Sequence, residues 1–328
     1  MRRLSLLLAL AACGDDAPTT PDAAPIPDDG TSGGCAPSAG WVDLPPLADG
    51  PTQETATVAL DGRIYVVGGF RGTTVLDTVQ VFDAQACTWT DGPALPRPVH
   101  HANVVVVGNT LWVVGAMEGL SFTTHPHVWS WAPATETAWT PHAAMPNPRG
   151  SSVAGVIDGK ILVAGGLRNG AVSEVSSFDP VAGTWDPHPV LPVARDHGCG
   201  GVVGDTLYVT GGRATSIGST SGTVYAYTPG GSWIPKAPMP TARGGTACAV
   251  VGSSIYVLGG EGNPDDASGV FPQVEAYDTV TDTWTTLAPM PHPRHGMAAA
   301  AWNGSIYVPG GADVEAFGAV ATHDVLTP

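Results

Sequence analysis

Positive charge is scarce in this chain of 328 residues. It has 13 lysines and arginines against 29 acidic residues, and its formal net charge is −16. An acidic surface of this kind repels phosphate backbones and anionic lipids, which argues against nucleic-acid binding and against membrane attachment through basic residues. Charged residues of both signs make up 13% of the chain, compared with roughly 25% in typical globular domains. Much of the surface is therefore expected to consist of small and uncharged residues.

Motifs of the common nucleophilic and nucleotide-binding enzymes are also missing. We find no serine nucleophile elbow between a strand and a helix, no phosphate-binding Gly-x-x-x-x-Gly-Lys, and no dinucleotide-binding glycine motif in a strand-to-helix setting. The compact Cys/His spacing of small zinc sites is absent as well. The sequence thus predicts no cofactor and no metal, and it favours a binding protein over an enzyme.

A six-fold repeat dominates what the sequence does contain. An apolar run ending in glycine recurs six times, and the first glycines of these runs stand at positions 68, 115, 165, 211, 259 and 310. A tryptophan recurs in phase with them at positions 41, 89, 139, 185, 233 and 284. Both series advance by 46 to 51 residues, as in 211 − 165 = 46 and 310 − 259 = 51. A period near fifty is typical of a propeller or another repeat array.

Each repeat predicts four short antiparallel strands. In the unit around Asp158-Gly159, this dipeptide separates two apolar runs in the manner of a two-residue hairpin turn. An alternating segment at residues 175–179 and a tryptophan strand at Trp185 follow.

The marks of the unit resemble those of the Kelch repeat. They are an apolar strand closing on Gly68-Gly69, the aromatic-Asp pair Phe82-Asp83, and Trp89, with Ala116 replacing the second glycine in one repeat. The resemblance covers about residues 40–328, and it implies that each unit is one propeller blade. The expected fold is an all-β, six-bladed Kelch-type β-propeller.

The ends of the chain predict how the ring closes. The last unit has a third strand at residues 322–327 but no tryptophan strand after it, while a tryptophan strand at residues 40–44 has no unit of its own. We expect the N-terminal strand to complete the last blade, because closure removes open sheet edges. Residues 314–317 are then loop.

The N-terminus reads as a targeting segment. Met1-Arg2-Arg3 precedes an apolar run to Ala12, as in a secretory signal, and Leu10-Ala11-Ala12-Cys13 resembles the bacterial lipobox. The resemblance implies a signal peptide at 1–12, a lipidated flexible linker at 13–39 starting at Cys13, and the propeller at 40–328. The protein would lie in the bacterial cell envelope, exposed to the periplasm or cell surface and membrane-bound through lipid alone. An ordinary signal with a nearby cysteine is the alternative.

Four cysteines remain in the body of the chain. An exported protein is in a compartment where disulfides form, and a Cys35–Cys87 bridge would staple the closure point; connectivity is open on sequence alone. Cys199 and Cys248 fall in the innermost strands of consecutive blades, 12 and 11 residues before their glycine pairs, so alternation points them to opposite faces. We interpret them as separate small buried residues.

One rim of the propeller is predicted to be the binding face. Residues after each glycine pair and residues that start each first strand share this rim. The charged and histidine residues expected there are Glu54, Arg71, His101, Glu118, Arg149, Arg168, Arg195, His197, Arg213, Arg243, Glu261, Arg294 and His295. The arginines could bind carboxylates, or each could pack within its own repeat. The histidines, with Glu54 or Asp196, could hold a metal or act as a base, although solvated rim histidines are the interpretation that we favour.

The functions consistent with this rim belong to two classes. The first is a monomeric binding module for a glycan, peptide or protein, with specificity in the loops at 117–124 and 261–272. The second follows from the resemblance to six-bladed, exported Kelch propellers that act as sialic-acid mutarotases, and it would use Glu and Arg residues at the channel mouth. The Tyr-Cys and histidine set of copper-radical oxidases with a Kelch propeller cannot be located, so no oxidase activity is predicted.

Overall fold

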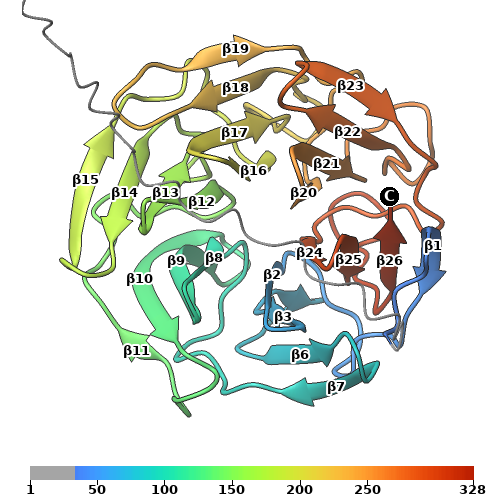
Figure 1. The fold of residues 1–328 in the computed structure, drawn as a ribbon, viewed down its shortest axis with the longest axis horizontal. Coiled ribbons are helices and arrows are strands. Elements are labelled where there is room, and N and C mark those ends of the chain that lie inside the picture. The colour runs from blue at the N-terminus through green and yellow to red at the C-terminus, as the bar shows by residue number, and fades with distance from the viewer. Residues whose placement is uncertain (1–33) are drawn as a thin grey trace, which may run out of the picture. The chain divides into compact units, whose positions relative to one another are not determined.

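The computed structural model describes residues 34–328, which form a ring of six four-stranded antiparallel sheets (Figure 1). In each blade the first strand lies next to the central axis and the tryptophan strand lies outermost. The six-bladed all-β propeller predicted from the sequence is confirmed. Residues 1–33, with the predicted signal peptide and Cys13, lie outside the described residues. Within 34–328 no helix is long and apolar enough to cross a membrane.

The blades follow one another along the chain, and the last one takes its fourth strand from the N-terminus. Blade 1 consists of β2 (Ala56–Leu60), β3 (Arg63–Val67), β6 (Val79–Asp83) and β7 (Thr88–Asp91). Blade 2 consists of β8 (Val104–Val107), β9 (Thr110–Glu118), β10 (Thr123–Trp131) and β11 (Thr140–Pro141). Blade 3 consists of β12 (Val153–Ile157), β13 (Lys160–Ala164), β14 (Val175–Asp179) and β15 (Thr184–His188). Blade 4 consists of β16 (Cys199–Val203), β17 (Thr206–Thr210), β18 (Val224–Tyr227) and β19 (Ile234–Lys236). Blade 5 consists of β20 (Ala247–Val251), β21 (Ser254–Leu258), β22 (Val274–Asp278) and β23 (Thr283–Thr286). Blade 6 consists of β24 (Ala300–Trp302), β25 (Ser305–Pro309), β26 (His323–Thr327) and β1 (Gly40–Asp43).

Two loop segments on the rim are more ordered than the sequence indicates. A short hairpin, β4 (Phe70–Arg71) with β5 (Thr74–Val75), follows the first glycine pair. The segment 117–124, expected to be a loop, is half strand: residues 117–118 end β9, residues 123–124 begin β10, and a turn at residues 119–122 joins them. Residues 314–317 form no strand, as predicted.

The N-terminal strand closes the ring. β1 pairs antiparallel with β26 in a register that joins Gly40 to Thr327 and Asp43 to Asp324, so the predicted closure is confirmed. Residues 34–39, assigned to the linker from the sequence, lie against blade 1, where the amide of Cys35 donates to the carbonyl of Ala84 at 3.1 Å. Cys35 and Cys87 form the disulfide considered from the sequence, with their Cα atoms 5.6 Å apart.

The core lies between the faces of neighbouring blades. A typical cluster joins Tyr65 and Val67 of blade 1 to Val113 and Trp129 of blade 2. No four-stranded sheet buries both of its faces alone, so each blade depends on its neighbours for burial. The repeated tryptophans add a hydrogen bond each, because their indole Nε1 donates to a carbonyl that follows the outermost strand of the preceding blade. The acceptors for Trp41, Trp89, Trp139, Trp185, Trp233 and Trp284 are Ala288, Pro45, Pro93, Ala143, Pro189 and Ala237.

The glycine pairs allow the blades to approach each other closely. A Cβ on Gly259 would lie 2.2 Å from the carbonyl oxygen of Arg294, and one on Gly68 would lie 2.4 Å from that of Val99. The next residue, Gly260, donates its amide to the same Arg294 carbonyl at 2.9 Å. A side chain at the first glycine would therefore disrupt this backbone contact between one blade and the segment that enters the next.

Candidate functional site

Six residues, one from each blade, form a closed ring of backbone hydrogen bonds around one mouth of the central channel. These mouth residues are Glu54, His101, Ser151, His197, Gly245 and Gly296. The amide of each donates to the carbonyl of the equivalent residue in the preceding blade, and the amide of Glu54 closes the circle on Gly296. All six have a left-handed backbone with φ between 50° and 65°. Four of them are not glycine, and such strained non-glycine positions cluster at functional sites.

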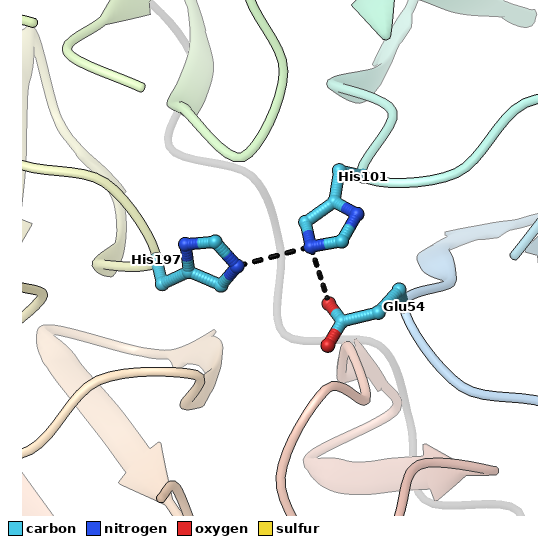
Figure 2. Close-up of side chains that lie close together, drawn as sticks. All are labelled: Glu54, His101 and His197. Carbon is cyan, nitrogen blue, oxygen red and sulfur yellow. Dashed lines mark hydrogen bonds and ion pairs between the residues drawn. The ribbon is translucent and has the colours of Figure 1, made fainter. Parts of the chain in front are cut away.

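Three of the mouth residues bring their side chains together (Figure 2). The Nε2 atom of His101 lies 3.0 Å from Oε2 of Glu54 and 3.0 Å from Nε2 of His197. His101 is 6% exposed and His197 5% exposed, so the expectation that the rim histidines are solvated is wrong. We call Glu54, His101 and His197 the mouth triad.

Hydrogen bonds on the far side of each imidazole fix its orientation. Nε2 of His100 donates to the carbonyl of Gly119 at 2.9 Å, which leaves its Nδ1, in the neutral ring, to accept from Nδ1 of His101. Nδ1 of His197 donates to Oδ1 of Asp196. The ring faces of His100 and His101 are covered by Phe122, with centroids 4.9 and 5.2 Å away.

A second layer of charge lies beside the triad. Arg213 donates to Oδ1 of Asp196 at 3.0 Å, to Oε1 of Glu261, and through Nη2 to Nε2 of His197 at 2.9 Å. The other oxygen of Glu261 lies 3.4 Å from Nδ1 of His295. His295 is 1% exposed and its Nε2 donates to the carbonyl of Val314 at 3.0 Å. The structure thus gathers Glu54, His101, His197, Arg213, Glu261 and His295 of the predicted rim residues.

The buried position of this cluster shifts its proton affinities. Burial alone would raise the pKa of Glu54, but attraction to His101, His197 and His295 holds that pKa well below its usual range. Burial lowers the pKa of His100 to about 4 and also lowers the pKa of His197, where the charge of Arg213 adds to the effect. Burial opposes ionisation of Asp196, but His197 and Arg213 lower its pKa overall. The carboxylates are therefore ionised at neutral pH, and His100 and His197 are neutral.

The four first-strand arginines do not belong to this cluster. Arg149, Arg243 and Arg294 are at most 1% exposed and Arg195 is 3% exposed. Each donates to the carbonyl of the first glycine of its own pair, 16 residues on, at 2.8 to 2.9 Å. Of the two roles considered for these arginines, packing within the repeat is the one that the structure shows, and their assignment to the residues of the binding rim is corrected, because they donate to carbonyls inside the blade.

The remaining predicted residues lie on rim loops apart from the triad. Nε of Arg71 donates to the carbonyl of Pro51 at 2.8 Å. Arg168 pairs with Glu174. Glu118 accepts two bonds from Arg97 and lies 3.4 Å from Nε2 of His125.

Behind the mouth lies a cavity of about 270 Å³, lined by residues of the first strands of blades 1 to 5, by residues 296–299 just before β24, and by the mouth triad. Cys199 and Cys248 line it and form a disulfide, with Cα atoms 5.5 Å apart. The prediction of two separate cysteines is therefore wrong. Side chains on opposite faces of equivalent strands point toward each other when those strands belong to adjacent blades.

A signal for the mouth position was present in the sequence. Each mouth residue stands 14 positions before the first glycine of its blade, as in 68 − 54 = 14 and 211 − 197 = 14. Aligning the repeats on the glycine pairs would have placed Ser151, Gly245 and Gly296 in one column with Glu54, His101 and His197. The carboxylate partner Asp196 would have followed as the preceding residue. Only folding shows that this column converges on the axis.

Comparison with known protein families and structures gives consistent matches. The KLHDC2/KLHL20/DRC7 Kelch-repeats domain matches residues 39–212, and the Kelch motif matches residues 242–291. A Kelch-like protein, terF, of Aspergillus terreus is 34% identical over 88% of this chain, and the match spans 66% of that protein's length. Mouse Kelch-like protein 35 is 29% identical over 44% of the chain and 24% of its own length. The chain thus spans less than two thirds of these relatives.

Among solved structures, that of YjhT superimposes with a TM-score of 0.71 and 18% identity, covering 85% of this chain and 95% of that one. At this level of identity the match concerns the fold.

Proposed function

The chain belongs to the Kelch-repeat proteins, and from that premise we propose that it is a binding module that takes a protein or peptide partner on the mouth rim. Kelch propellers generally mediate protein binding. The proposal places the partner on the loops that follow the glycine pairs in blades 5, 6, 1 and 2.

Exposed apolar side chains on these loops are the observation that carries the proposal. Leu120 is 40%, Val314 41% and Phe317 56% exposed. Phe317 packs on Phe70 with centroids 5.6 Å apart, and Phe70 packs on His100 at 5.4 Å. Phe70 and His100 are buried, so this row of rings lies beneath the rim and fixes the exposed Phe317 of the blade 6 loop against blades 1 and 2. Apolar groups of this kind within a polar rim are typical of interaction sites.

Charge on the same loops indicates the chemistry of the partner. The exposed acidic residues next to the apolar ones are Asp265, Asp266, Asp313 and Glu315. The loops of blades 5 and 6 that carry them touch, because the amide of Glu315 donates to the carbonyl of Ser268 at 2.8 Å. A segment with basic residues and apolar anchors would complement this surface in both charge and shape.

Selection of a random peptide library on the purified chain tests the proposal. We expect selected peptides to combine lysine or arginine with large apolar residues, and the Leu120→Asp/Phe317→Asp double variant to bind them at least about tenfold more weakly. Val181→Asp is the matched control, since Val181 is 98% exposed on the opposite rim. Equal losses in the control and the double variant would refute the assignment of the rim.

The alternative activity, mutarotation of a sialic-acid-like sugar, makes a different demand. It requires guanidinium groups directed at the ligand, whereas Arg213, the arginine that reaches the triad, is paired with Asp196 and Glu261. Thermal-shift measurements with sialic and uronic acids separate the two functions. A stabilising sugar acid together with no peptide selection would favour the enzyme. A glycan partner of the module would stabilise the chain without consuming or converting the sugar.

We also propose that Cys13 carries the lipid that attaches the chain to the cell envelope. The support is the four-residue resemblance at Leu10-Ala11-Ala12-Cys13. Cys13→Ser should move the protein from the membrane fraction to the soluble fraction. Retention of the variant in the membrane fraction would contradict lipidation at this residue.

A further inference from the structure

We propose that the mouth triad, Glu54, His101 and His197, is a binding site for a divalent zinc-type metal ion. Two imidazole nitrogens and one carboxylate are a ligand set of zinc sites that keep a position open for water or substrate. The three donor groups lie within 4.8 Å of one another. They come from blades 1, 2 and 4, so the closed ring holds them together (Figure 2).

The tautomers imposed by the outer hydrogen bonds are the first argument. His101 donates through Nδ1 to His100, and His197 donates through Nδ1 to Asp196. In the neutral rings, both Nε2 atoms then carry a lone pair instead of a proton. Nε2 of His101 lies 3.0 Å from Nε2 of His197 and 3.0 Å from Oε2 of Glu54. Acceptors that face one another in a buried site favour a cation, and the guanidinium of Arg213 already donates to one of them, Nε2 of His197.

The outer hydrogen bonds also match those of metal-binding histidines. Such residues almost always donate their other ring N–H to a carboxylate, a carbonyl or another fixed acceptor, which sets the tautomer. Asp196 supplies that carboxylate for His197, and His100, itself fixed by Gly119, supplies the acceptor for His101. Ligands about 2.1 Å from a common metal lie roughly 3.0 to 3.4 Å apart. The two separations from Nε2 of His101, each 3.0 Å, fit this range, and all the donor atoms lie within 4.8 Å of one another.

The charge of the cluster is the second argument. Three largely buried carboxylates, Glu54, Asp196 and Glu261, are accompanied by the single guanidinium of Arg213. These four side chains thus carry three acidic groups and one basic group, a negative balance that favours a divalent cation. The buried Nδ1 of His295 has no hydrogen-bond partner and lies between two of these carboxylates, 3.4 Å from Oε2 of Glu261 and 3.9 Å from Oε1 of Glu54.

Arg213 makes the one contact with the triad that a bound metal ion would have to displace. Its Nη2 donates to the lone pair on Nε2 of His197 at 2.9 Å. Metal binding requires this one contact to open, while the bonds of Arg213 to Asp196 and Glu261 can remain. The triad also lines the central cavity, so the open coordination position of the metal would face that space.

Zinc titration of the purified, tag-free chain after chelator treatment tests the proposal. Two other groups, Glu118 with His125 and His127 and Asp43 with His292 and Asp324, also have donor atoms within 4.8 Å of one another. The titration therefore uses a His125→Asn/His127→Asn/His292→Asn background. We expect one zinc ion per chain by calorimetry, and a Co²⁺ complex with a visible ligand-field spectrum of a four- or five-coordinate ion.

Variants identify the ligands. Glu54→Gln, His101→Asn and His197→Asn should each weaken zinc binding by about 100-fold or more, and Asp196→Asn, which acts through His197, by about 10-fold. Circular dichroism establishes that each variant is folded, and Arg71→Gln on the same rim serves as the unaffected control. If the parent chain binds no zinc, or if Glu54→Gln and His197→Asn both bind it as tightly as the parent, the proposal is wrong.

Discussion

Two columns of the repeat, only two residues apart, differ in what they do. The column 16 residues before the first glycine holds Arg149, Arg195, Arg243 and Arg294, and each arginine makes the same bond to its own blade. The column 14 residues before it holds the mouth residues, where the backbone is the same in all six blades but the side chain is Glu, His, Ser, His, Gly and Gly. An arginine that recurs with the same hydrogen bond stabilises the fold, whereas side chains that differ on the same backbone conformation form the candidate site.

Removal of an arginine from the first column should produce the largest effect. Arg294 donates to the carbonyls of Val308, His292 and Gly310, and to Asp324, which is fully buried. Arg294→Met leaves that carboxylate without its cation and should cost about 3–5 kcal/mol of unfolding free energy in urea titrations. Arg63→Met is the control, because the exposed Arg63–Asp83 pair contributes at most about 1 kcal/mol. Similar losses of unfolding free energy in Arg294→Met and Arg63→Met would contradict a stabilising role of the arginine column.

The disulfide next to the mouth column should have the second largest effect. Cys199 and Cys248 join blades 4 and 5, where the column changes from His197 to Gly245. The Cys199→Ala/Cys248→Ala variant should lose about 2–4 kcal/mol of unfolding free energy. In this double variant a reductant can break only the Cys35–Cys87 disulfide among the described residues. Any further loss of unfolding free energy that the reductant causes therefore measures the contribution of Cys35–Cys87.

A buried histidine outside the column gives a pH dependence that is independent of the mouth. Burial, aided by Arg294, lowers the pKa of His323 to about 3, and its Nε2 has no hydrogen-bond partner. The unfolded chain binds this proton near pH 6.5 and the folded chain does not, so stability falls as pH decreases from about 6.5 toward 3. His323→Phe should flatten that part of the curve of unfolding free energy against pH. An unchanged slope would show that His323 is not buried in its neutral form.

The backbone of the mouth column should give the smallest effect. Ser151 has φ 51°, which costs a non-glycine residue about 1–2 kcal/mol. Because glycine also gains entropy in the unfolded chain, Ser151→Gly should stabilise the protein by less than about 1 kcal/mol. Gly296→Ala should destabilise it, since the added Cβ would lie 2.6 Å from Oε1 of Glu54. Differential scanning calorimetry should show a higher melting temperature for Ser151→Gly and a lower one for Gly296→Ala. A higher melting temperature for Gly296→Ala would contradict the ring geometry.

Local patterns in the sequence were sufficient to predict the fold and its closure. The spacing of Trp41 and Gly310 predicted that the first strand would complete the last blade, and β1 does pair with β26. The same patterns did not identify which charged residues face the channel. The arginine column lies on the predicted rim, but a long side chain can turn back into its own blade, and hydrogen bonds to three carbonyls make that direction favourable.

The amino-acid sequence determined the number of blades, their strand order and the strand that closes the ring, because periodic apolar runs, turn dipeptides and tryptophans act within some fifty residues. The tertiary structure decided that Glu54, His101 and His197 meet, that Cys199 faces Cys248, and that the arginines turn inward. The contacts of the triad and of the disulfide join residues far apart in the sequence, as in 101 − 54 = 47, 248 − 199 = 49 and 197 − 101 = 96. Their geometry depends on how far each blade is rotated about the common axis, a quantity that only the packing of all six blades sets.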